Sequence, residues 1–234
     1  MNVRLPRRRR QSIGGGPGEL GGAAPDLIRS LEQRRLPGAE PTSVGPELAV
    51  FSVVFVCTGN RARSPLAEAL LRRRVESLPV HVSSCGTLDL GGLPPLPEAS
   101  AVAATLGVDL AKHRSRQLLA GGLAAADLVV GFEPAHIARA IEEGEADSGR
   151  TFLLLELPTA LAEGPASART TSEVEWARHV VREMGARRPA WPTDDDRMTL
   201  LDPYGESRQR FAEMARVLDA MTGLLAVRLF PNET

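Results

Sequence analysis

The sequence predicts an α/β fold: a three-layer sandwich in which a four-stranded parallel sheet carries helices on both faces. Short apolar runs alternate along the chain with segments of helical periodicity. This alternation is typical of parallel sheets whose strands are joined by crossover helices. A short polar loop follows the first apolar run, and proline then opens a helical segment, which predicts a phosphate loop after the first strand.

These patterns place the elements in chain order. The predicted strands are residues 53–56, 80–83, 126–132 and 151–157. The predicted helices are residues 65–78, 98–106, 133–143 and 172–184, with Ser172 as the N-cap of the last, and a C-terminal helix that reaches about Arg228. Parallel strands end at one edge of the sheet, where α/β proteins usually carry their sites.

Composition favours one folded domain with appended segments. The 234 residues are 43% hydrophobic but only 4% aromatic, so we expect a core of Leu, Val and Ala. A formal net charge of −1 gives no general attraction to nucleic acid, and no apolar run is long enough to span a bilayer. Two cysteines, Cys57 and Cys85, do not indicate a disulfide framework. A nucleophilic cysteine fits a reducing cytoplasm, where we expect the protein to act.

We expect residues 1–48 to form a disordered N-terminal extension. Residues 7–10 are all arginine and residues 12–24 are rich in glycine, so the segment has little apolar surface to bury. No apolar region follows the arginines, which argues against an export signal. Binding of an acidic partner by this cluster stays open. The folded domain is expected to cover residues 49–230.

Cys57 and Arg63 bound the predicted phosphate loop, with five residues between them. A thiol surrounded by loop amides, beside a guanidinium, is expected to lose its proton easily, and the thiolate is the nucleophile. The planar fork of Arg63 can hold two phosphoryl oxygens. Ser64 can donate a hydrogen bond to the thiolate and make it a better leaving group. The residues expected to bind phosphate are Thr58, Gly59, Asn60, Arg61, Ala62, Arg63 and Ser64.

Two loop residues have backbone roles in this interpretation. Gly59 lets the backbone come close to the ligand, and Asn60 tolerates a left-handed conformation while its amide braces the loop. The alternative is a buried structural cysteine before an ordinary strand-to-helix turn.

The run Val-Cys-Thr-Gly-Asn-x-x-Arg-Ser-Pro resembles the phosphate loop of the low-molecular-weight protein tyrosine phosphatase family. The resemblance implies a hydrolase that cleaves phosphomonoesters, above all protein phosphotyrosine, through a phosphocysteine intermediate on Cys57. It implies a phosphorylated protein as substrate and partner, and a mechanism that requires neither metal nor other cofactor. The sequence does not indicate an oligomeric state.

The same resemblance implies a general acid in an Asp-Pro-aromatic motif, which this chain has at Asp202, Pro203 and Tyr204. Asp202 would protonate the leaving group and later activate water. Pro203 would stiffen the loop, and Tyr204 would form one wall of the substrate cleft. Alone, such a motif is a common turn sequence.

The chain also departs from the family. Ala62 stands where the family commonly has a second cysteine, which leaves open whether Cys85 protects Cys57 by a disulfide. Residues 88–97 contain no aromatic side chain to serve as a wall for a phosphoaryl ring. An insertion at about residues 158–198 is either a lid that brings Trp176 or Trp191 to the cleft, or a segment packed on the domain surface.

Further residues carry smaller expectations. His113 and Arg116 match a family segment and are expected to brace the edge of the sheet. Arg61 is neither the apolar residue that accompanies phosphotyrosine nor the threonine that accompanies phosphoarginine in relatives. The alternatives are therefore a protein-arginine phosphatase, a thioredoxin-linked arsenate reductase, which needs two further cysteines, and a non-catalytic pseudophosphatase that binds phosphorylated partners.

Overall fold

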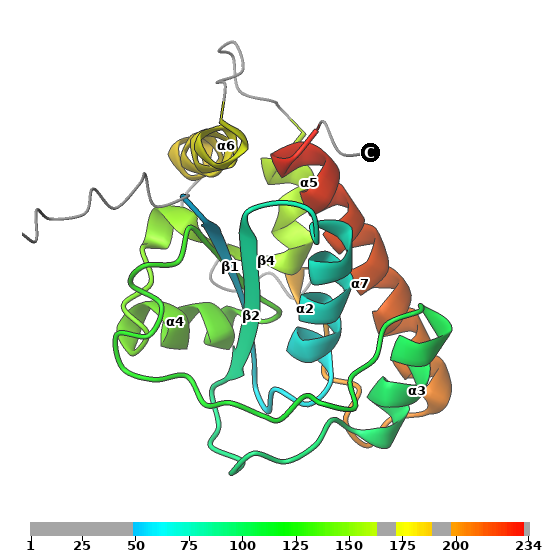
Figure 1. The fold of residues 1–234 in the computed structure, drawn as a ribbon. Coiled ribbons are helices and arrows are strands. Elements are labelled where there is room, and N and C mark those ends of the chain that lie inside the picture. Colours follow the sequence, from blue (N-terminus) through cyan, green and yellow to red (C-terminus); the bar gives the residue numbers. More distant parts are fainter. Residues whose placement is uncertain (1–48, 163–171, 189–197, 232–234) are drawn as a thin grey trace, which may run out of the picture. The chain divides into compact units, whose positions relative to one another are not determined.

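The computed structural model describes residues 49–162, 172–188 and 198–231. Its strands are β1 (Phe51–Cys57), β2 (Val80–Gly86), β3 (Leu128–Gly131) and β4 (Thr151–Leu153). They form one sheet in the order β2-β1-β3-β4, and every neighbouring pair is parallel (Figure 1). The predicted four-stranded parallel sheet is confirmed.

Helices cover both faces of this sheet. The α-helices are α2 (Arg63–Arg74), α3 (Pro97–Thr105), α4 (Pro134–Glu142), α5 (Leu157–Ala160), α6 (Glu173–Arg187) and α7 (Arg208–Leu229), with 3-10 helices at Ser148–Arg150 and Leu154–Glu156. Figure 1 shows α2 and α7 on one face and α4 on the other, as the three-layer prediction requires. Among the described residues, no helix is both long and apolar enough to cross a membrane.

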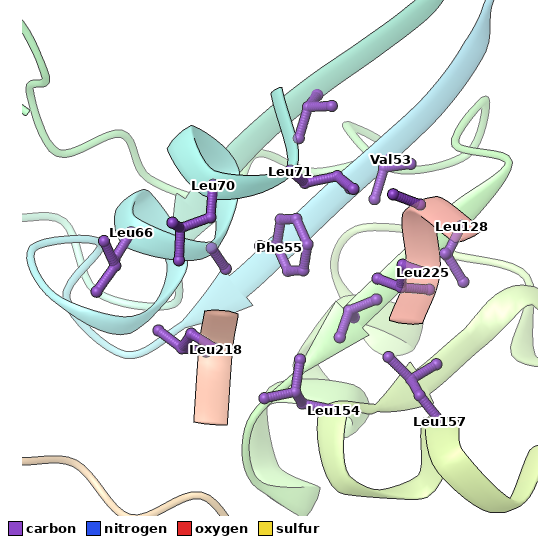
Figure 2. Packing of buried hydrophobic residues seen from close by; sticks show 14 of the residues in the cluster. Val53, Phe55, Leu66, Leu70, Leu71, Leu128, Leu154, Leu157, Leu218 and Leu225 are labelled. Carbon is purple, nitrogen blue, oxygen red and sulfur yellow. The ribbon is translucent and has the colours of Figure 1, made fainter. Parts of the chain in front are cut away.

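Alternation along β1 separates the two cores. Phe51, Val53 and Phe55 point to the face covered by α2 and α7, while Val54 and Val56 join a smaller cluster with α4. In Figure 2 the ring of Phe55 lies among leucines from α2, α7 and the segment after β4. The aliphatic core expected from the composition is therefore built mainly on one face.

Several boundaries differ from the prediction by a few residues, and the differences at one helix and one strand have a clear physical reason. The helix predicted at residues 65–78 runs instead from Arg63 to Arg74, so Pro65 lies inside its first turn, where its missing N–H needs no partner. The strand predicted at residues 151–157 ends at Leu153, and the following leucines form helical turns with Pro158 near the start of α5. Leucine favours helix more than the β-branched residues do, so a short apolar run left this ambiguous.

The insertion expected at residues 158–198 is described in part. Ser172 caps α6 by accepting a hydrogen bond from Glu175 N, as predicted. Trp176 is buried in the main core, and Figure 1 shows α6 beside the beginning of β1, at the end of the sheet away from the phosphate loop. The lid interpretation is therefore wrong for Trp176. Trp191 and the predicted extension at residues 1–48 lie outside the described residues.

Candidate active site

The loop between β1 and α2 closes around the Cys57 sulfur. Cys57 is the last residue of β1, and α2 begins at Arg63. Asn60 has a left-handed backbone with φ of 50°, and its N–H donates to Cys57 Sγ at 3.2 Å. Backbone curvature thus turns an amide toward the sulfur of Cys57, a residue that is only 3% exposed.

The Asn60 side chain holds the loop in place through hydrogen bonds to neighbouring segments. Its Oδ1 accepts the N–H of Arg116 at 2.9 Å, so the amide nitrogen faces the other way. That Nδ2 donates to Ser64 Oγ at 2.9 Å and to Ser84 Oγ at 2.7 Å. His113 Nε2 lies 2.8 Å from the Asn60 carbonyl oxygen. Asn60 itself is fully buried and its contacts are buried or partly buried, which makes it a structural centre of the loop.

Arg116 has the bracing role at the edge of the sheet that the sequence predicts, whereas the His113 side chain contacts the phosphate loop at Asn60. The Arg116 carbonyl accepts the N–H of Gly86 at 2.7 Å, which attaches this segment to the edge strand β2. Arg116 also pairs with the buried Glu68 at 3.0 Å, and Ser84 donates to the same carboxylate. Glu68 and Ser84 were not singled out from the sequence.

Ser64 lies in the position expected for a donor to the sulfur. Its Oγ is 3.0 Å from Cys57 Sγ. Because Ser64 already accepts from Asn60 Nδ2, its own hydrogen is available, and the carbonyl of Cys85 is farther away at 3.4 Å. The geometry therefore favours a hydrogen bond from Ser64 to the sulfur.

Arg63 is 1% exposed and its guanidinium is held by several acceptors. Its Nη1 donates to the carboxylate of Glu133 and, at 3.0 Å, to the carbonyl of Leu200. Its Nη2 donates to Asp202 Oδ2 at 2.5 Å and to Thr58 Oγ at 3.3 Å. In the part of the chain that the structure describes, the Arg63 Nε–H has no acceptor, so it remains available to an anion in the loop.

Asp202 reaches the loop on a segment that is hydrogen-bonded to the residue after β3. The N–H of Leu200 donates to the carbonyl of Phe132 at 2.9 Å, directly after β3. Asp202 Oδ1 accepts the N–H of Tyr204 at 3.1 Å, a turn that orients the carboxylate. The structure therefore brings Cys57, Arg63 and Asp202 to one place.

These residues line a cavity of about 300 Å³. Its lining residues are Cys57, Thr58, Gly59, Arg61, Ala62, Arg63, Leu88, Leu90, Leu93, Leu96, Asp202 and Tyr204. Four leucines from residues 88–97, the segment without an aromatic side chain, form one wall of the cavity. Tyr204, which is 71% exposed, lies at the rim. The Arg61 side chain is also at the cavity, where its Nε donates to the carbonyl of Pro94 at 2.7 Å.

Cys85 lies on the other side of the sheet from Cys57. The register pairs Val56 with Cys85, and both belong to the smaller cluster, whereas Cys57 belongs to the main core. Burial, with a smaller contribution from Cys57, raises the pKa of Cys85 to about 12. Both thiols are free. This arrangement gives no support to a protective disulfide between them.

Glu133 and His136 are functional candidates that sequence reasoning did not single out. Both follow β3 at the carboxyl edge of the sheet, and this position is the signal that they offered. Glu133 pairs with Arg63, and His136 contacts Thr58. The described residues contain no group of three His, Cys, Asp or Glu side chains placed to hold a metal ion.

Comparison with known proteins agrees with this geometry. The sequence profile described as "Low molecular weight phosphotyrosine protein phosphatase" matches residues 52–165. The chain is 38% identical over 109 residues to a probable low molecular weight protein-tyrosine-phosphatase, EpsP, from Ralstonia nicotianae, covering 46% of this chain and 73% of that protein. It is 38% identical over 107 residues to the phosphatase Etp of Escherichia coli, covering 46% and 71%.

Solved structures give the same result for the fold. The Erwinia amylovora tyrosine phosphatase AmsI matches with a TM-score of 0.54 at 24% identity, covering 76% of this chain and 91% of that one. A Bacillus subtilis YwlE mutant matches with a TM-score of 0.55 at 25% identity, covering 76% and 98%.

The fold and the loop thus define a phosphatase of the α/β class. The chain belongs to the low molecular weight protein-tyrosine-phosphatase family, and it is a hydrolase. The predicted family and fold are confirmed. The matched range ends at residue 165, so the role of Asp202 rests on the site geometry.

Proposed function

We propose that the protein hydrolyses phosphotyrosine in proteins through a phosphocysteine on Cys57. One observation carries the proposal: Cys57 Sγ, held by Asn60 N–H and beside Ser64 Oγ, shares a single cavity with Arg63 and Asp202. A nucleophile, an anion-binding group and a proton donor are the parts that a two-step phosphoryl transfer needs. The domain that contains them is residues 49–230.

In the first step the Cys57 thiolate attacks phosphorus. The S–P bond forms while the P–O bond to the substrate breaks, and Asp202 gives its proton to the departing oxygen. Loop amides and the Arg63 guanidinium stabilise the charge on the other phosphoryl oxygens. The hydrogen bond between Arg63 and Asp202 holds the carboxyl group beside the reacting centre.

In the second step water attacks the phosphocysteine. Asp202, now a carboxylate, accepts a proton from the water as the new P–O bond forms and the S–P bond breaks. The sulfur leaves as a thiolate, which Ser64 stabilises through the contact at 3.0 Å. Phosphate departs and the thiolate is restored. Because that thiolate must stay reduced, we propose that the protein acts in the cytoplasm.

The shape of the cleft supports an aryl phosphate. Its wall of leucines offers apolar surface to a ring, and Tyr204 stands at the rim. A related fold, that of Vibrio vulnificus Wzb, was solved with benzylphosphonate, with a TM-score of 0.55 at 20% identity. Arg61 adds a positive charge at the cleft, which favours acidic groups near the phosphorylated residue.

The test is hydrolysis of p-nitrophenyl phosphate without added metal by the wild type and by Cys57→Ser. We expect turnover in the wild type only, and faster hydrolysis of a phosphotyrosine peptide than of a phosphoarginine peptide. The reverse peptide preference would instead make the protein an arginine phosphatase. No turnover, with vanadate still raising the Tm, would indicate a binding module. Arsenate-dependent thiol oxidation would indicate a reductase.

A further inference from the structure

His136 links the end of β3 to the first residue of the phosphate loop. It lies in α4 and is 2% exposed. Its Nδ1 accepts the N–H of Phe132 at 3.2 Å, and its Nε2 is 3.0 Å from Thr58 Oγ. A backbone N–H can only donate, so Nδ1 carries no proton. A neutral ring must then carry its proton on Nε2 and donate it to Thr58.

The surroundings keep this ring neutral. Burial and, to a smaller extent, the positive charge of Arg63 lower the pKa of His136 to about 3, against a smaller opposing effect of Asp202. The imidazole therefore holds the same tautomer throughout the neutral pH range. Thr58 Oγ therefore accepts a hydrogen bond from His136 Nε2 and cannot donate one to it.

Arg63 occupies the second acceptor position of the Thr58 hydroxyl. Its Nη2 donates to Thr58 Oγ at 3.3 Å. A hydroxyl oxygen has two lone pairs and one hydrogen. With both lone pairs used, the hydrogen must point away from His136 and Arg63. The described residues offer it no acceptor, and Thr58 lines the cavity that holds Cys57 and Asp202.

We infer that the Thr58 hydroxyl donates a hydrogen bond to the transferring phosphoryl group, and that His136 is the positioning residue that aims it. The inference rests on the proposed function. It adds a side-chain donor to the loop amides and Arg63. It also explains why a buried histidine contacts Thr58. A hydroxyl that His136 has already oriented does not need to turn when charge develops on the phosphoryl oxygens.

Four single variants and one double variant test this. Thr58→Val removes the hydroxyl and keeps the shape, whereas Thr58→Ser keeps the hydroxyl. His136→Asn removes the nitrogen that donates to Thr58. In His136→Gln the longer side chain can place its amide nitrogen at the position of Nε2. We expect Thr58→Val and His136→Asn to lower kcat for p-nitrophenyl phosphate by about 10- to 100-fold, the size of a lost hydrogen bond to a charged group. KM should change little, and Thr58→Ser and His136→Gln should retain most of kcat.

The double variant decides whether His136 acts through Thr58. Adding His136→Asn to Thr58→Val should cause no further loss of kcat, because the group that His136 aims is already gone. Controls are Thr105→Val on α3 and His81→Asn on β2, both at exposed positions outside the cavity, which should match the wild type. The Tm of each variant is measured alongside.

The inhibition constant or binding constant of vanadate gives a readout that does not need turnover. It should weaken by about tenfold in Thr58→Val and in His136→Asn. Thr58→Val within twofold of the wild type in both kcat and vanadate affinity would overturn the inference, as would additive losses in the double variant. A wild type that does not turn over would instead contradict the proposed function, and vanadate binding would still decide the inference.

Discussion

Arg63 Nη2 donates to Asp202 Oδ2 at 2.5 Å, across 139 residues of sequence. Arg63 is buried at the start of α2, and Asp202 stands on the segment that precedes α7. The bond places the predicted proton donor at the predicted anion-binding group. The segment that carries Asp202 is therefore held in place by its contact with Arg63 as well as by its own turn.

Replacing Asp202 should slow the release of poor leaving groups. In Asp202→Asn the side chain keeps its size but cannot donate the proton that the departing oxygen needs, so we expect kcat to fall by about 10²- to 10⁴-fold with a phenyl phosphate. The loss should be smaller with p-nitrophenyl phosphate, whose leaving group is a stable anion. The measurement is kcat across a series of aryl phosphates.

The control for this series is Glu206→Gln, which removes an exposed carboxylate near Asp202 and outside the cavity of Cys57. Equal losses across all leaving groups in Asp202→Asn would contradict the role of Asp202 as the acid.

Replacing Asn60 should destabilise the protein. Asn60→Ala removes the acceptor of the Arg116 N–H and the donor to Ser64 and Ser84, all in a buried site. It also places alanine at a left-handed backbone position. We expect a loss of about 2–4 kcal/mol in the free energy of unfolding, measured by urea denaturation. A loss below about 0.5 kcal/mol, the range of ordinary surface changes, would show that the network is not structural.

Replacing Gly86 or Gly223 by alanine should have opposite effects on stability. A Cβ at Gly86 would lie 2.8 Å from the Thr58 carbonyl oxygen and 3.0 Å from Asn60 N, so Gly86→Ala should displace the loop and lower both Tm and kcat. A Cβ at Gly223, inside α7, would meet only the end of the Arg74 side chain at 3.6 Å. Gly223→Ala should therefore stabilise the helix by about 0.5–1 kcal/mol and leave kcat unchanged. Equal Tm for the two variants would contradict this account.

His136 should make stability depend on pH. Its pKa falls from 6.5 to about 3 on folding, so the unfolded chain binds this proton more readily. The stability that it contributes is present above about pH 6.5 and is lost as the pH falls toward 3, on the order of 1 kcal/mol for each pH unit. The measurement is the difference in unfolding free energy between wild type and His136→Gln from pH 7 to pH 4. A difference that is constant with pH would show that His136 titrates normally.

The parts of the site that could be predicted from the sequence are those whose residues lie close together along the chain. Cys57 and Arg63 lie on one strand–loop–helix unit, so their spacing together with the flanking apolar run and the proline-opened helix predicts the loop, and Asn60 was expected to brace it. Its partners Ser84 and Arg116 come from distant segments and need the folded sheet to be seen.

Other parts of the site had weaker signals. Asp202 came from a motif that is common in turns, and the structure shows its contact with Arg63. Glu133 lies after β3, 70 residues from Arg63, with no recognised motif around it. The leucine run after Leu153 was predicted as strand, because its burial is plain from the sequence and its periodicity is not.

The most direct test of the account is to look for the covalent intermediate. Wild type and Cys57→Ser are mixed with p-nitrophenyl phosphate, denatured within the first turnover and digested for mass spectrometry. The account predicts one added phosphoryl group on the peptide that contains Cys57 in the wild type. In Cys57→Ser it predicts no added phosphoryl group and no hydrolysis. Continued hydrolysis by Cys57→Ser, or a phosphoryl group on another residue, would contradict it.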